Sequence, residues 1–169
     1  LSFGNNYGSH RGDSLLENYI DTVAAMGRTV IVTGTGNNGS QPWHAGGILQ
    51  QGKTEEIQLA VGVFEPTLNV QLWKDYEDEM EIYLESPSGE RIGPLYERLG
   101  PTRRHLLENT RASDLLLENP VPYQLSQEIY IDFIPEGNYV DSGVWKVLLS
   151  GKRVALRTVI SSGCRVEMY

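Results

Sequence analysis

The spacing of apolar residues changes near residue 52, and this change divides the chain into two predicted parts. In the first part, the apolar residues of one helical face recur at helical spacing: Leu15, Leu16, Tyr19, Ile20 and Val23. Ser14 and Glu17 match a capping box, in which a hydroxyl and a carboxylate satisfy the first free amides of a helix. Gly27 is placed to end the helix as a C-cap. The pattern therefore predicts an amphipathic helix between residues 14 and 27.

Apolar segments lie on both sides of this helix. Residues 1–4 have the pattern of the end of a short strand. Val30, Ile31 and Val32 form a continuous β-branched run without polar alternation, which is typical of a strand covered on both faces in a parallel sheet. The order of strand, helix and strand predicts a βαβ unit with a right-handed crossover. Residues 1–52 are therefore expected to form an α/β part.

From Thr54 onward the period of the apolar residues is two. They alternate with polar or small residues in three successive runs: Ile57, Leu59, Val61 and Val63; Leu68, Val70 and Leu72; Met80, Ile82 and Leu84. Turn sequences separate these runs, and further strands are expected near 104–108, 114–118, 128–134, 144–149 and 154–160. Short strands without helices between them predict an antiparallel sandwich or jelly roll at residues 53–169. The linker, 40–53, is short.

The turn after the β-branched run is the main candidate for chemistry. It reads GTGNNG from Gly34 to Gly39, and in open α/β sheets the groups that meet a ligand lie just past the strand ends. Gly36 and Gly39 relax the backbone for a tight reversal and leave a short amide side chain able to face a cleft. Asn37 is therefore the first candidate site residue. The alternative is an asparagine that only tolerates a left-handed turn, the role expected for its neighbour Asn38.

The charge and the cysteine content exclude several classes of partner. Fourteen Lys and Arg against 22 Asp and Glu give a net charge of −8, which repels nucleic acid and anionic lipid, so neither is expected as a partner. Cys164 is the one cysteine, and no Cys/His spacing of the zinc type occurs, so neither a metal nor a cofactor is expected. No apolar run is long enough to span a bilayer, and LSFGNN lacks the features of a signal peptide. Since it begins at Leu1, the chain is expected to be cut from something longer.

Four further groups of residues have both a functional and a structural interpretation, and the structural one is favoured for each. His44 could act as a base near the turn, or lie on a surface between domains. Ser14 could act as a nucleophile, but the helix cap explains it without catalysis. The acidic run 75–81 could bind calcium, but it lacks the alternating ligand spacing, which favours a solvated turn. Four aromatic residues could form a sugar-binding platform or belong to the core: Trp73, Trp145, Tyr130 and Phe133.

Several of these segments together resemble the clostridial spore-germination type of subtilisin-like serine protease. The matching stretches are SFGNNYGSH, SLLENYIDTVAAMGRTVIV, GTGNNG, LNVQLWKDYEDEMEIYLESPSGERIGP and QEIYIDFIPEGNYVDSGVWK, and the resemblance covers nearly all of the chain. It implies that Asn37 corresponds to the asparagine of the family's AAGNxG motif, which supplies the side-chain donor of the oxyanion hole. It also implies that the sandwich is a jelly-roll domain inserted between that asparagine and the nucleophilic serine, in a secreted or spore-associated protein.

The sequence also departs from this family. The motifs of the catalytic aspartate, histidine and serine, which are DTGI-like, HGTxVA-like and GTSxAxP, do not occur, and the segment after Gly151 drifts from the expected closing strand. The resemblance thus implies a piece of a serine endopeptidase that is inactive alone and whose partners are a peptide or protein substrate and the remainder of the subtilase domain. A noncatalytic β-sandwich module for interaction or stabilisation, as in family members thought to lack a complete triad and to act in signalling, stays open as the alternative.

Overall fold

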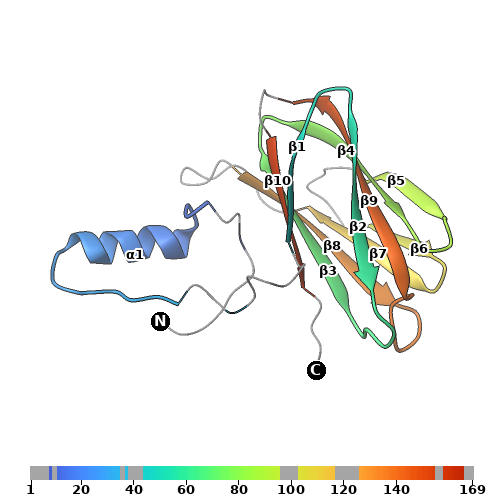
Figure 1. Cartoon of the computed structure of the whole chain (residues 1–169), viewed down its shortest axis with the longest axis horizontal. Helices are drawn as coiled ribbons and strands as arrows, with labels where there is room; N and C mark the ends of the chain where they lie inside the picture. Colours follow the sequence, from blue (N-terminus) through green and yellow to red (C-terminus); the bar gives the residue numbers. More distant parts are fainter. Residues whose placement is uncertain are drawn as a thin grey trace.

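The computed structural model describes residues 8, 11–34, 37, 44–95, 103–116, 126–154 and 158–165. In this part of the chain, helix α1 (Leu15–Ala25) precedes ten strands, and Figure 1 shows α1 to one side of a two-layered β-sandwich. The strands are β1 (His44–Leu49), β2 (Thr54–Val61), β3 (Leu68–Asp75), β4 (Glu79–Glu85), β5 (Arg91–Leu95), β6 (Arg103–Leu107), β7 (Thr110–Leu116), β8 (Ser126–Pro135), β9 (Gly143–Arg153) and β10 (Thr158–Arg165). No helix among the described residues has the length and apolar content needed to cross a membrane.

The strands form two antiparallel sheets. Sheet A has the order β1-β10-β3-β8-β7-β6, and sheet B has the order β2-β9-β4-β5. The chain passes repeatedly from one sheet to the other, so that β10 lies between β1 and β3, and β9 lies between β2 and β4. Each sheet is therefore held together by strands that are distant in sequence, which only a folded tertiary structure can bring together.

The prediction of a parallel βαβ sheet in the first part of the chain is wrong. Every ladder in the described residues is antiparallel, and residues 29–34 form no strand. The side chains of Val30 and Val32 are 90% and 73% exposed. A β-branched run is stabilised as a strand by neighbouring strands and by burial, and the described residues place neither around this segment. The first predicted strand, 1–4, lies outside the described residues.

Two strands of the sandwich were not predicted. β1 lies within the segment 40–53 that was expected to be a linker, and it pairs with β10 from His44–Gly163 to Leu49–Thr158. Its Gly46-Gly47 pair conceals the pattern of a strand, because glycine is unfavourable in strand interiors. β5 contains Pro94 and lies at the edge of sheet B, where a missing backbone donor is tolerated.

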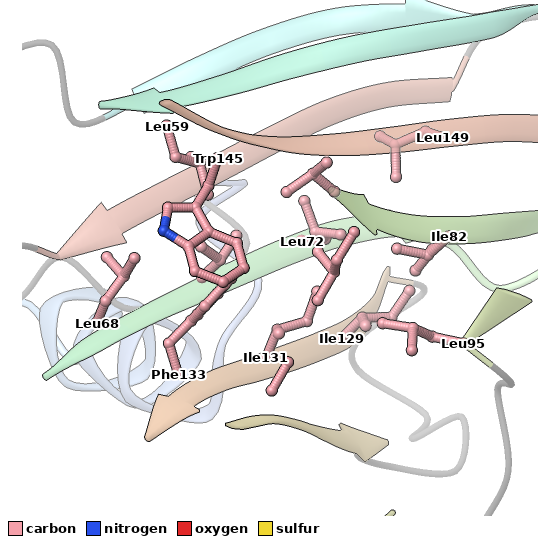
Figure 2. Close-up of a cluster of buried hydrophobic side chains, with 14 of the residues drawn as sticks. Leu59, Leu68, Leu72, Ile82, Leu95, Ile129, Ile131, Phe133, Trp145 and Leu149 are labelled. Carbon is pink, nitrogen blue, oxygen red and sulfur yellow. The ribbon is translucent and has the colours of Figure 1, made fainter. Parts of the chain in front are cut away.

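The hydrophobic core lies between the two sheets. Figure 2 shows side chains from sheet B, such as Leu59, Trp145 and Leu149, facing Leu72, Ile131 and Phe133 of sheet A. The rings of Phe133 and Trp145 meet edge to face with centroids 5.1 Å apart, and both residues are 1% exposed. The Trp145 Nε1 donates to the carbonyl oxygen of Asp141 at 2.8 Å, so its buried N–H is satisfied. The period-two pattern thus correctly predicted an antiparallel sandwich.

Helix α1 has the predicted caps but no buried face. The Ser14 Oγ accepts from the Glu17 N–H at 3.4 Å, and the Ser14 N–H donates to Glu17 Oε2 at 2.9 Å, which confirms the capping box. Gly27 follows the helix with a φ of 67°, the left-handed conformation that favours glycine at this position. No residue of α1 is buried, and Leu15 and Tyr19 are each 66% exposed. Local capping therefore accounts for where this helix begins and ends, without tertiary packing.

Candidate functional site

The candidate site begins at Asn37, which lies in an exposed bend after residues 29–34. An asparagine amide offers two N–H donors and does not titrate, so an exposed Asn37 can donate a hydrogen bond to an anionic oxygen. Its neighbours at positions 35, 36 and 38–40 lie outside the described residues, so the conformation of the predicted GTGNNG turn is described only at Gly34 and Asn37.

An ion pair links the segment before α1 to the sandwich. The Arg11 Nη1 lies 2.7 Å from Asp75 Oδ1 at the end of β3, and the two side chains are 39% and 32% exposed. An ion pair with this exposure contributes at most about 1 kcal/mol, because water screens it. The pair positions the first part of the chain beside sheet A but supplies little of the stability.

The outer face of sheet A carries a row of buried side chains that the sequence analysis did not single out. On β3 the residues Asn69, Gln71 and Trp73 alternate with residues of the core, yet Gln71 is only 4% exposed and Trp73 only 8%. Within the described part of the chain, Trp73 Nε1 and Asn69 Oδ1 are buried without a hydrogen-bond partner. Strand β8 places Asp132 beside Asn69, and burial raises the pKa of its carboxyl. This face is therefore polar and largely withdrawn from solvent.

The four aromatic residues considered for sugar binding do not form one platform. Phe133 and Trp145 lie in the core, as expected. Trp73 is on the opposite face of sheet A, and Tyr130 of β8 is paired with Gln71 on that same face. Successive side chains of a strand point to opposite faces. The core assignment is confirmed for Phe133 and Trp145. Trp73 is buried as expected, at 8% exposed, but on the outer face, and the assignment is wrong for Tyr130, which is half-buried. The signal was present in the sequence, because Trp73 has the opposite parity to Leu72.

The remaining candidates have structural roles or lie outside the description. Ser14 caps α1, as expected. His44 begins β1, but its side chain is not among the described ones.

The acidic run 75–81 includes the turn between β3 and β4, where the buried Lys74 Nζ donates to the Asp78 carbonyl oxygen at 2.7 Å. Asp78 is 2% exposed, so the expectation of a solvated turn is wrong at this residue. Among the described residues, no group of three metal-ligating side chains occurs.

One end of the sandwich contains both the beginning of β1 and the end of β10, and we call it the connection end. The register places His44 opposite Gly163, and Arg165 opposite Asn69 near the beginning of β3. The loops 62–67, 86–90, 108–109 and 136–142 lie at the same end, because β2, β4, β6 and β8 end there.

A hydrogen-bond network joins three of these loops. Asp141 Oδ2 accepts from the Thr110 hydroxyl at 2.7 Å and from the Asn109 N–H at 3.0 Å. Glu108 Oε1 accepts from the Ser88 N–H at 2.9 Å, and the Glu108 N–H donates to Glu90 Oε2 at 3.1 Å. Hydrogen bonds to carboxylates are among the stronger ones in proteins. The carboxylates of Asp141, Glu108 and Glu90 therefore join the loops 86–90, 108–109 and 136–142 at the connection end.

The comparison with solved structures gives an informative match. None of the family models and none of the curated proteins that were compared matches the chain. Among solved structures, the chain is similar to the Clostridium perfringens CspB protease, with a TM-score of 0.82 and 25% sequence identity. The match covers 96% of this chain and 34% of that protease. The chain thus spans about a third of the length of the protease, and the similarity supports a relation to the subtilase-like proteases.

Proposed function

We propose that the chain is part of a subtilisin-like serine endopeptidase, in which Asn37 donates to the oxyanion and the sandwich is an inserted jelly-roll domain. The similarity to the clostridial protease over 96% of the chain is the observation that carries this proposal. In this proposal the boundary moves from residue 52, where the sequence placed it, to the beginning of β1, because β1 pairs with β10 inside sheet A. The residues before β1 belong to the catalytic domain, and the sandwich is the insertion.

The strand order supports the jelly-roll assignment. The strands β1-β10-β3-β8 and β2-β9-β4-β5 form two facing sheets of four strands each, and the hairpin of β6 and β7 extends the first sheet. Eight strands in two sheets with connections between the sheets are typical of a jelly roll. Because the chain enters and leaves this sandwich at the connection end, the sandwich can be inserted in a second domain without separating the two parts of that domain.

The exposed amide of Asn37 suits the chemistry of acyl transfer. When a serine attacks a peptide carbonyl, negative charge develops on the former carbonyl oxygen, and a donor aimed at that oxygen stabilises the transition state more than the substrate. A histidine base and an orienting aspartate would activate the serine. Since none of these three motifs occurs in the present sequence, they belong to the rest of the proposed enzyme, and the chain alone should not hydrolyse peptides.

The test is the substitution Asn37→Ala in the complete protease, with Asn38→Ala in the same turn as the matched control. Loss of the oxyanion donor should lower kcat about 10²- to 10³-fold with little change in KM, a magnitude taken from subtilisin. Asn38→Ala should retain most of the activity. Unchanged turnover of Asn37→Ala in an active protease would remove this residue from the mechanism.

The noncatalytic module is the competing proposal. It predicts that the complete polypeptide lacks one or more of the aspartate, histidine and serine motifs and does not cleave peptides. Reading the flanking coding sequence and assaying the purified polypeptide for peptide hydrolysis separates the two proposals.

A further inference from the structure

Two hydrogen-bond acceptors lie beside each other on the outer face of sheet A. Asn69 of β3 is the register partner of Asp132 of β8, and side chains directly opposite each other on two strands have Cβ atoms about 4.5–5.5 Å apart. Asn69 Oδ1 is buried without a hydrogen-bond partner. In the described part of the chain, the Asp132 carboxylate also accepts no hydrogen bond and forms no ion pair. Two neighbouring side chains therefore both lack a donor.

A single proton can satisfy both side chains. An ionised carboxylate is only an acceptor, whereas a protonated carboxyl also has an O–H donor. In the folded chain, burial raises the pKa of the Asp132 carboxyl, so this carboxyl holds a proton more tightly than an exposed aspartate does. A protonated Asp132 can donate to Asn69 Oδ1, which removes the free-energy cost of leaving that buried acceptor unpaired.

The charged groups around Asp132 favour a proton as its partner. Arg111 of β7 forms an ion pair with Glu136, just after β8. Arg104 of β6 and Arg165 of β10 each lie two strands away from Asp132, which corresponds to a backbone separation of about 10 Å, and their side chains are not among the described ones. The nearest neighbours on the same face are uncharged at neutral pH: Ser113, Tyr130, Ile134 and Gln71.

We propose that Asp132 and Asn69 form a pH-sensitive clamp between β3 and β8, in which Asp132 takes up a proton from solvent and its O–H donates to Asn69 Oδ1. The clamp lies near the beginning of β3, at the connection end. When the pH rises, the proton returns to solvent, two acceptors lie side by side, and the folded state loses this contact between the strands. The clamp belongs to the sandwich itself and does not depend on the proposed function.

An NMR titration of the present chain tests the clamp. The side-chain Cγ resonances of Asp132 and Asn69 should change together, with a midpoint above the ordinary pKa of an aspartate, whereas the Cγ of the exposed Asn138 should not follow them. Asn69→Leu keeps the site covered but removes the acceptor, so the pKa of Asp132 should fall towards its ordinary value. The matched control, Asn138→Leu, should leave that pKa unchanged.

Two results of this titration would overturn the proposal. A pKa of Asp132 at or below the ordinary value in the unchanged chain would mean that a donor, such as the turned amide of Asn69 or an arginine, satisfies the ionised carboxylate. A pKa that stays raised in Asn69→Leu would assign the shift to burial alone.

A double-mutant cycle supplies a second, independent readout. The variants Asn69→Leu and Asp132→Ala, made singly and together in the present chain, give the coupling between the two positions from denaturant unfolding. The coupling should stabilise the folded state at about pH 4 and vanish at about pH 8, where an aspartate is normally ionised. A coupling of the same size at both pH values, or none at either, would overturn the clamp.

Discussion

The N-terminal part of the chain and the sandwich respond differently to equally clear apolar patterns. In the sandwich, residues such as Leu72, Val147 and Leu149 are 0% exposed. In α1 and the segment after it, apolar residues at regular spacing remain in solvent, and Val30 is 90% exposed. The difference is that the sandwich contains both faces of its own core, whereas the described residues bury no residue of α1. An apolar pattern predicts a surface that requires burial, but it does not supply the partner.

A matched pair of leucine truncations should give the largest difference in the free energy of unfolding. Leu72→Ala removes a fully buried side chain from the core and should lower the free energy of unfolding by about 2–5 kcal/mol. Leu16→Ala makes the same chemical change at a site that is 54% exposed and should change it by less than about 0.5 kcal/mol. Denaturant unfolding of the present chain measures both. Similar losses at the two positions would show that α1 is packed and would erase the contrast.

Removing the N-cap of α1 should have a smaller effect on stability, confined to the helix. Ser14→Ala removes the hydroxyl that accepts from the Glu17 N–H and should destabilise the helix by about 1 kcal/mol. Because α1 buries none of its residues, this loss should appear as faster amide exchange within α1 and not in the unfolding of the sandwich. A shift in the unfolding midpoint of the sandwich as large as that of a core variant would contradict this separation.

A substitution at Asp132, on the outer face of sheet A, should change the stability of the chain in a pH-dependent way. Burial raises the pKa of Asp132 in the folded state, so the folded state binds its proton more tightly than the unfolded state does. The free-energy cost of ionising the buried carboxyl is absent at low pH, where Asp132 is protonated in both the folded and the unfolded state. This cost develops as the pH rises from the ordinary pKa of an aspartate towards the raised pKa of Asp132. Asp132→Asn should therefore stabilise the chain at neutral pH and have little effect at low pH. Unfolding of both proteins between about pH 3 and pH 8 checks this, and a stabilisation that is the same at every pH would argue against a titrating carboxyl.

Removing the ion pair between Arg11 and Asp75 should have the smallest effect on stability. A double-mutant cycle with Arg11→Gln and Asp75→Asn should give a coupling energy below about 1 kcal/mol, because both side chains are partly exposed. Added salt should reduce it further. A coupling several times larger would mean that the first part of the chain stabilises the sandwich, and the two regions would not be independent.

Local signals were sufficient for some features of the fold. The capping box at Ser14 and Glu17, the left-handed Gly27 and the period of two from Ile57 onward all describe interactions within a few residues or the alternation of one strand. They correctly predicted the helix and the antiparallel sandwich.

Features that depend on distant residues could not be predicted in the same way. β1 is a strand because β10 pairs with it more than a hundred residues later, and its two glycines hide the pattern. The run at Val30 has a strand-like composition but no neighbouring strand among the described residues. At the candidate site, sequence reasoning selected Asn37 from its turn and from a family resemblance, whereas the hydrogen bonds of Asp141 and Glu108 join loops that only the fold brings together.

Hydrogen exchange of the α1 amides, measured in the present chain and in the complete protease, tests the central claim most directly. In the chain alone, the α1 amides should be only weakly protected, since an isolated helix of 11 residues is marginal in water, while the strands of the core exchange slowly. In the complete protease of the proposed function, α1 should become as protected as the core, because in that proposal the rest of the catalytic domain covers its apolar face. Exchange from α1 that is equally fast in both proteins would contradict the account.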